Sequence, residues 1–172
     1  MTAPSWKDRT QRILSLWFPH LCAERLLREW LGRSWRSRPA IPPLVISRRE
    51  NNTRRIAALD ERAETLGLKR GMGIADAQAM HPGIRVIEDD PIADLKLLES
   101  LADWCDRYTP LVALDGTDGL FLDVTGCTHL FGGEAGLLRD LLSRLEHQGI
   151  GAKVGIASTA GAAWAAARFS GR

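Results

Sequence analysis

A short turn between two apolar runs in the second half of the chain constrains the fold more than any other feature. Residues 111–114 and 120–124 are mainly apolar, and the residues between them read Asp-Gly-Thr-Asp-Gly. Aspartate and glycine tolerate the backbone of tight turns, so this stretch predicts a β-hairpin. Apolar residues recur at helical spacing before it, over 91–108, and after it, over 133–147, which predicts a helix on each side.

The remaining segments alternate between strand and helix patterns. We expect strands at 13–18, 44–47, 55–59, 84–87 and 152–157, helices at about 19–31, 62–66 and 74–80, and a last helix capped by Ser158. The outer segments therefore read β-α followed by α-β-β-α-β. This order predicts a mixed α/β (α+β) fold of the ferredoxin-like type, with a small α/β unit inserted between about residues 40 and 90.

Composition argues against membrane proteins and disulfide-built proteins. No apolar run approaches the roughly 18 residues that span a bilayer, and the polar N-terminal residues contain no apolar signal core. We therefore expect a cytoplasmic protein. The three cysteines lie far apart, which indicates reduced thiols rather than a disulfide framework or a Cys-x-x-Cys metal site. The four scattered histidines are interpreted as structural.

The hairpin region resembles a motif of the Y-family DNA polymerases, the UmuC- and DinB-like enzymes that copy damaged DNA. The family motif reads Ser-Ile-Asp-Glu-Ala-Tyr-Leu-Asp-Val-Thr, and residues 122–125, Leu-Asp-Val-Thr, set the register. Asp118 then falls on the catalytic aspartate, and Gly119 falls on the glutamate beside it. A site for two magnesium ions needs several carboxylate ligands, and glycine supplies none.

A second block of resemblance lies near the N-terminus. Residues 13–24 resemble the family strand that ends in Asp-Met-Asp-Ala-Phe-Phe-Ala-Ser, aligned through Ala23. Trp17 and Pro19 then occupy the positions of two aspartates. Cys22 occupies the position of the aromatic residue that excludes ribonucleotides. No aspartate or glutamate precedes Ala23 in this block, so we expect no metal ligand from this strand end.

Two further blocks resemble the parts of the family that bind the incoming nucleotide. In residues 61–72, Glu61 and Glu64 replace the tyrosine and the arginine that grip the triphosphate. Carboxylates at these positions would repel a triphosphate. In residues 153–164, Ala160 and Trp164 replace two lysines, the first of which contacts phosphate in the family.

The resemblance covers most of residues 11–169 and implies a division into domains. We expect a disordered basic start at 1–11, a first part of the palm at 12–40, the fingers at 41–90 and a second part of the palm at 91–172. The thumb and little-finger domains of the family are missing. The chain is therefore expected to be an N-terminal fragment or a truncated product.

The surviving apolar and glycine framework, without the reactive side chains, resembles the catalytically inactive Y-family paralogues of bacterial mutasome operons. Residues 16–19, Leu-Trp-Phe-Pro, match a segment typical of that group. The resemblance implies a DNA-repair and translesion-synthesis scaffold in SOS-induced mutagenesis, without a metal or cofactor. It also implies three partners, namely the sliding clamp, a RecA-like accessory protein and a second polymerase of the DnaE type.

Two other functions remain open from the sequence. An active Y-family polymerase would need magnesium and would have to combine Asp118 with carboxylates from elsewhere in the chain. A different ferredoxin-like nucleotidyl enzyme, such as a cyclase, is suggested only by residues 131–134, Phe-Gly-Gly-Glu. That loop lies at a predicted helix start and lacks the rest of a cyclase motif.

Positive charge is concentrated in the first third of the chain. Residues 1–55 contain twelve basic and four acidic side chains, a net charge of +8, whereas the whole chain carries +2. Four of these basic residues, Arg48, Arg49, Arg54 and Arg55, flank the turn of the predicted 44–59 hairpin. Arginine makes bidentate contacts with phosphate, and together with the polymerase resemblance this predicts weak, sequence-independent DNA binding. A solvated surface without a ligand is the alternative.

Overall fold

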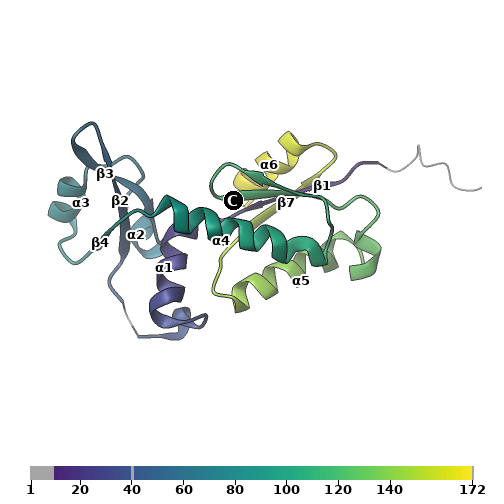
Figure 1. The fold of residues 1–172 in the computed structure, drawn as a ribbon, viewed down its shortest axis with the longest axis horizontal. Helices are drawn as coiled ribbons and strands as arrows, with labels where there is room; N and C mark the ends of the chain where they lie inside the picture. The colour runs from purple at the N-terminus through teal and green to yellow at the C-terminus, as the bar shows by residue number, and fades with distance from the viewer. Residues whose placement is uncertain (1–9, 40, 172) are drawn as a thin grey trace, which may run out of the picture. The chain divides into compact units, whose positions relative to one another are not determined.

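The computed structural model describes residues 10–39 and 41–171, so most of the predicted disordered start lies outside the described residues (Figure 1). The strands are β1 (Ile13–Trp17), β2 (Leu44–Glu50), β3 (Thr53–Leu59), β4 (Arg85–Glu88), β5 (Val112–Asp115), β6 (Gly119–Asp123) and β7 (Lys153–Ala157). The α-helices are α1 (Leu21–Leu31), α2 (Glu61–Thr65), α3 (Ile74–Met80), α4 (Pro91–Trp104), α5 (Glu134–His147) and α6 (Ala160–Phe169). Short 3-10 turns are η2 (Trp35–Ser37), η3 (Cys105–Arg107) and η4 (Thr128–Phe131).

The chain forms two compact units. The first contains the residues up to Pro19 together with 95–146 and 152–172, and the second contains 20–94 and 147–151. Contacts thus place α1 with the second unit, although the sequence assigned it to the palm. The palm and fingers boundaries, which rest on resemblance, stay predictions. In the described part of the chain, no helix is both long and apolar enough to cross a bilayer.

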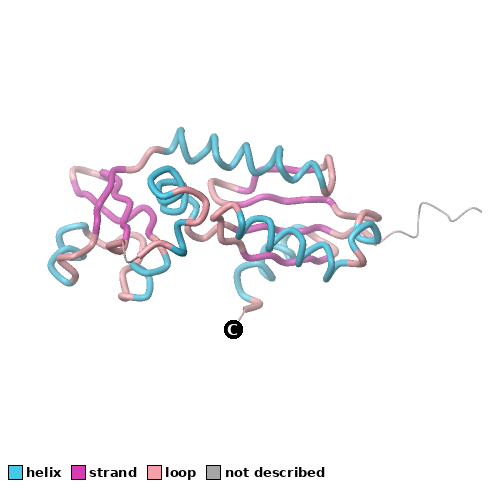
Figure 2. Tube along the Cα trace, turned by 90° about the horizontal axis from the view of Figure 1, so that it is seen from below, coloured by secondary structure: helices cyan, strands magenta, loops and turns pink. Residues whose placement is uncertain are grey.

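The first unit is built on an antiparallel sheet in the order β5-β6-β1-β7, whose strands are the magenta tubes that lie side by side in Figure 2. Leu14 and Leu16 of β1 face one side, pair with Leu122 and Leu120 of β6, and are fully buried. Because side chains alternate along a strand, Ser15 and its partner Gly155 in β7 face the other side. Helix α6 packs there. The order of strands and helices confirms the predicted mixed α/β fold.

Gly155 sets how closely α6 approaches the sheet. A Cβ atom added to Gly155 would lie 2.5 Å from the Ala163 carbonyl oxygen and 2.5 Å from the Ala167 nitrogen, both main-chain atoms of α6. The residue that precedes helix α6 is Thr159, whose hydroxyl accepts a hydrogen bond from the Ala162 N–H at 3.3 Å. Thr159 rather than the predicted Ser158 is therefore the helix cap.

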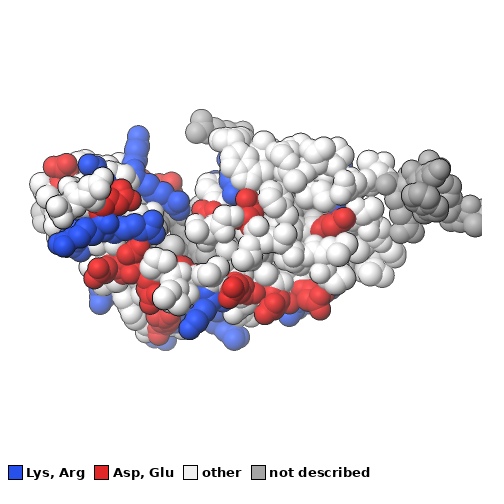
Figure 3. All heavy atoms as spheres, turned by 45° about the horizontal axis from the view of Figure 1, so that its top comes forward, with Lys and Arg blue, Asp and Glu red and all other residues white. Residues whose placement is uncertain are grey.

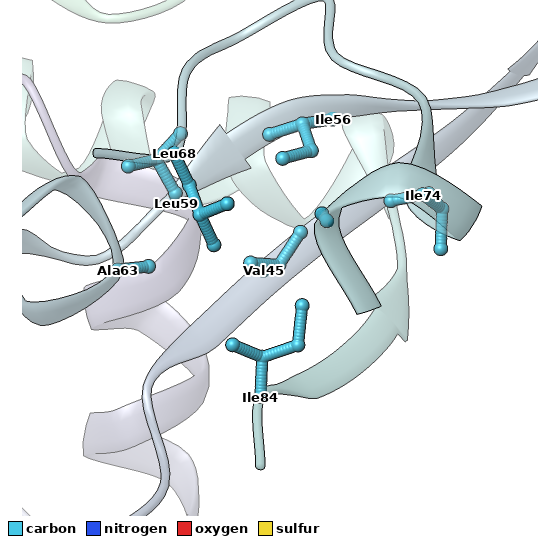
Figure 4. Packing of buried hydrophobic residues seen from close by; sticks show 8 residues of the cluster. Val45, Ile56, Leu59, Ala63, Leu68, Ile74 and Ile84 are labelled. Carbon is cyan, nitrogen blue, oxygen red and sulfur yellow. The ribbon is translucent and has the colours of Figure 1, made fainter. Parts of the chain in front are cut away.

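The second unit contains a sheet in the order β3-β2-β4, with β2 antiparallel to β3 and parallel to β4. One face packs on α2 and α3 through a core that includes Val45, Ile56, Leu68 and Ile74 (Figure 4). The β2–β3 hairpin turns at Asn51 and Asn52, whose φ angles are 47° and 63°. Asparagine adopts this left-handed backbone more readily than other non-glycine residues, which suits a two-residue turn.

Glu24 of α1 joins three segments of the second unit. Its carboxylate accepts hydrogen bonds from Arg36 Nη2 at 2.5 Å and from the Gly151 backbone N–H at 2.8 Å. Burial outweighs these partners and raises the pKa of Glu24 to about 7. The nearby indole of Trp35 donates to the Gly149 carbonyl at 2.9 Å. Residues 147–151 are thus tied to α1 and η2.

Candidate functional site

The ends of β1 and β6 bring together three of the residues that the sequence singled out. Trp17 pairs directly with Gly119 across the sheet. The Trp17 indole N–H donates a hydrogen bond to Asp118 Oδ2 at 3.2 Å, and the Phe18 N–H donates to the Asp118 carbonyl at 2.8 Å. Two of the three positions that the alignment equates with family aspartates, Trp17 and Asp118, are therefore joined by a hydrogen bond from an indole to a carboxylate.

Gly119 is buried and closely surrounded by Asp115. A Cβ atom added to Gly119 would lie 3.0 Å from Asp115 Oδ2 and 3.1 Å from the Asp115 carbonyl oxygen. Asp115 also accepts a hydrogen bond from Arg168 Nη2 at 3.3 Å. Asp115 was not predicted from the sequence, because its place in the site depends on the contact with Arg168, which lies 53 positions later in the chain.

Two cations lie over tryptophan rings close to the carboxylates of Asp115 and Asp118. The Arg168 guanidinium carbon is 5.1 Å from the ring centroid of Trp17 and 4.2 Å from that of Trp164. Lys153, the cross-strand partner of Trp17 in β7, places its Nζ 5.6 Å from the same Trp17 centroid. Neither cation was singled out from the sequence. The β1–β7 pairing register would have been needed to place Lys153 there.

The carboxylates at this position do not fit a two-metal site. Asp118 accepts from an indole, Asp115 is paired with a guanidinium, and Gly119 has no side chain. Two magnesium ions need several hard oxygen ligands, and this position offers two carboxylates, each of which already accepts a bond from a side chain through Oδ2. Within residues 10–39 and 41–171, no group of three or more histidine, cysteine, aspartate or glutamate residues is arranged to hold a metal ion.

The other positions that the family uses for nucleotides are also altered in chemistry. Cys22 lies in α1, where burial raises the pKa of its thiol to about 12, so the thiol stays protonated. Ala160 is the exposed first residue of α6 and offers no charge to a phosphate. Trp164, one turn later, packs edge-on against Phe169 with the ring centroids 6.1 Å apart.

Glu61 and Glu64 both lie on the exposed surface of α2 in the second unit. Asp60 caps this helix by accepting the Ala63 N–H at 2.8 Å. Glu64 Oε2 lies 3.2 Å from His20 Nε2, and the other ring nitrogen of His20 lies 2.9 Å from the Leu59 carbonyl. The most exposed charged side chains of this helix are therefore acidic.

The four hairpin arginines lie on the paired strands β2 and β3, on either side of the Asn51-Asn52 turn. Arg48 pairs with Arg55, and Arg49 pairs with Arg54. Arg48 Nε donates to Asp89 at 2.6 Å, and Arg55 donates to the carbonyl of Gly71 at 2.9 Å. Both side chains are exposed but are bonded within their own unit. In Figure 3 the basic side chains gather over the part of the molecule that contains β2–β4.

Arg49 and Arg54 face a polar hollow instead. The hollow has a volume of about 460 Å³ and is lined by Ser47, Arg49, Arg54 and Glu88. Arg54 donates one bond to the Ser47 hydroxyl at 2.8 Å, and no hydrogen bond or ion pair within the described chain holds the Arg49 guanidinium. Like charges placed directly opposite across a strand pair are unfavourable. Glu88 supplies one negative charge to the hollow, and an anion bound there would balance the second guanidinium.

Comparison with known proteins fits this geometry. The family model described as impB/mucB/samB matches residues 36–168. The chain belongs to this family. The ImuB protein of Caulobacter vibrioides (strain NA1000 / CB15N) is 56% identical over 104 residues, which is 60% of this chain and 23% of that protein. DNA polymerase IV of Alkaliphilus oremlandii is 26% identical over 117 residues, which is 67% of this chain and 29% of that protein.

The chain spans about a quarter of the length of these curated relatives. Among solved structures, it is similar to an insertion ternary complex of Dbh DNA polymerase, with a TM-score of 0.76 and 20% identity over 94% of this chain and 46% of that one. DinB from Sulfolobus solfataricus gives a TM-score of 0.65 and 22% identity over 85% and 42% of the two chains. The predicted Y-family palm and fingers fold of this impB/mucB/samB member is thereby confirmed.

Proposed function

We propose that this chain is a non-catalytic homologue of the Y-family DNA polymerases that serves as a scaffold in SOS-induced mutagenic repair. The observation that carries the proposal is the hydrogen bond between Trp17 and Asp118, because it engages the carboxylate that the family uses for metal. The identity with an ImuB protein supports it. The acidic exchanges at Glu61 and Glu64 support the loss of triphosphate binding.

The proposed partners follow from the resemblance to the inactive mutasome paralogues. They are the sliding clamp, the RecA-like protein ImuA and a second polymerase of the DnaE type, which carries out the synthesis. No cofactor is proposed. DNA is proposed as a further, weakly bound partner, held through phosphate contacts that do not depend on sequence.

We expect the purified protein to extend no primer. In an assay with a primed template, four deoxynucleotides and magnesium or manganese, product should not rise above the buffer control, while a Y-family polymerase IV extends the same primer. Isothermal titration with magnesium and a deoxynucleotide should give no binding heat, because Asp118 and Asp115 are engaged by Trp17 and Arg168. Template-directed, metal-dependent extension would favour the active-polymerase alternative.

DNA binding is expected to depend on Arg49 and Arg54 far more than on Arg48 and Arg55. Replacing Arg49 and Arg54 with glutamine should lower the slope of log affinity against log salt by about two units, roughly one for each phosphate that the protein no longer neutralises. The matched Arg48→Gln/Arg55→Gln variant removes the same charge but mainly breaks internal bonds. It should keep most of the salt slope and lose thermal stability.

Fluorescence anisotropy with labelled DNA over a range of salt concentrations measures both slopes. Equal decreases in the two variants would mean that only net charge matters. No decrease in either would make the hairpin a solvated surface without a DNA-binding role.

A further inference from the structure

Beside Trp17 the first unit contains a groove that the proposed scaffold function does not yet use. It has a volume of about 450 Å³, and its walls come from the paired ends of β1 and β7 and from the end of α6. The lining residues are Trp17, Lys153, Val154, Ala166, Ala167, Arg168, Phe169, Ser170 and Gly171. We propose that this groove binds a short peptide segment of a partner protein in which an acidic side chain stands next to an apolar one.

The apolar part of the groove is built to receive a side chain. Ala166 and Ala167 give a smooth helix wall, since alanine projects only a methyl group. Phe169 is 71% exposed, so its aromatic ring remains in contact with water at the end of α6. Aromatic residues of this kind often anchor an apolar side chain at protein interfaces.

The charged part of the groove consists of one fixed cation and one available cation. Arg168 is held in place by Asp115 and by stacking on Trp17 and Trp164, and its side chain is only 11% exposed. Lys153 is exposed, and no carboxylate of the described chain forms an ion pair with it. A ligand carboxylate at the Lys153 ammonium would complete a charge pair at the rim.

The local charge favours a peptide over DNA. Arg168 is paired with Asp115, so Lys153 is the cation left at the rim, and the groove lacks the extended positive charge of a DNA-binding surface. DNA-binding surfaces are strongly positive because the ligand is a polyanion. Base stacking is also disfavoured, since cations already lie over the rings of Trp17 and Trp164. The single carboxylate of a peptide side chain, by contrast, needs only one cation as its partner, and Lys153 supplies it.

This inference rests on the proposed scaffold function and adds the chemistry of a partner segment. The probe is the capped tripeptide acetyl-Asp-Leu-Phe-amide, compared with its Asn-Leu-Phe counterpart and with a thymidine decanucleotide. Binding is followed by the NMR signals of the Trp17 and Trp164 indoles and the Val154 amide. We expect the Asp peptide to shift these signals and the Asn peptide to bind about tenfold more weakly, because it lacks one charge-assisted hydrogen bond.

Two variants and one control locate the site. Lys153→Gln should abolish the difference between the Asp and Asn peptides. Phe169→Ala, at a side chain too exposed to support folding, should weaken both peptides. Lys69→Gln, at an exposed lysine of the second unit, should change neither. Absence of shifts up to about 5 mM, a range that detects even millimolar affinity, overturns the proposal. So do shifts caused by the decanucleotide and not by the peptide.

Primer extension on the same preparation separates this inference from the proposed function. If primers are extended, the scaffold proposal fails whatever the peptide does. If they are not extended and the peptide does not bind, only the peptide proposal fails.

Discussion

Restoring the carboxylates of the polymerase metal site is expected to lower the free energy of unfolding by about 3–5 kcal/mol, because removing a packed tryptophan alone costs that much. We also expect the restored variant to have no polymerase activity. The variant combines Trp17→Asp, Pro19→Asp and Gly119→Glu. It removes the indole that donates to Asp118 and carries Arg168 and Lys153. It also adds three carboxylates beside the two already present, which raises like-charge repulsion.

At Gly119, the destabilising effect of a larger side chain can be measured separately from the effect of its charge. Because the first side-chain carbon would lie 3.0 Å from Asp115 Oδ2, any long side chain must displace Asp115 from Arg168. Gly119→Gln introduces the same bulk without the charge. We expect Gly119→Gln to be destabilising and Gly119→Glu to be more so, as measured by urea unfolding at pH 7.

Activity should still be missing from the restored variant, because the nucleotide-binding positions remain altered. Glu61, Glu64, Ala160 and Trp164 leave the triphosphate without its family contacts. Incorporation of a labelled deoxynucleotide is the measurement. Detectable incorporation would show that only the metal ligands had been lost, and recent decay of an enzyme would then explain the sequence better than a dismantled nucleotide site.

The substitution Gly155→Ala is expected to cost about 3 kcal/mol, the upper end of the usual range for inserting one methyl group into a packed site. The added methyl would press on main-chain atoms of α6 at 2.5 Å, and backbone cannot move aside as a flexible side chain can. Helix α6 would have to shift away from β7 and β1. Urea unfolding monitored by circular dichroism gives the change in unfolding free energy.

The matched control is Gly161→Ala within α6. A Cβ atom there meets no other atom within 4 Å. Alanine also favours helix over glycine, so this variant should gain roughly 0.5 kcal/mol. Opposite signs for the same chemical change would identify close packing as the cause. A Gly155→Ala protein as stable as the wild type would mean that α6 does not depend on this contact.

The hairpin at 111–124 and the first strand were predictable because their residues carry local signals. The turn is encoded by Asp-Gly pairs, and the buried faces of β1 and β6 alternate with period two. The family motifs indicated that Trp17 and Gly119 belong to one site, whereas their pairing across the sheet is found only in the structure. The groove beside Trp17 was not predictable, since Arg168 meets Asp115 and Trp17 only through tertiary packing, and helical spacing contains no signal for it.

The ends of the two strands in the arginine hairpin were not predicted from the sequence. Exposed charged residues do not resemble a strand, so the predicted strands stopped before Arg48 and resumed at Arg55. The strands continue because the Asn51-Asn52 turn pairs them to their ends. Only with that register do Arg48 and Arg55 separate from Arg49 and Arg54. The sequence therefore indicated four exposed arginines as candidates for a phosphate contact. It contained no signal that two of them are bonded within the unit and that the other two line the hollow.

The division of the chain into two interleaved units determines how segments can be exchanged between relatives. The second unit consists of residues 20–94 and 147–151. In the shorter segment, Gly149 is hydrogen-bonded to Trp35 and Gly151 to Glu24. A chimaera that transplants only the longer segment would leave Glu24 facing a foreign loop. Grafting experiments, and recombination between homologous genes, should therefore succeed only when both segments travel together.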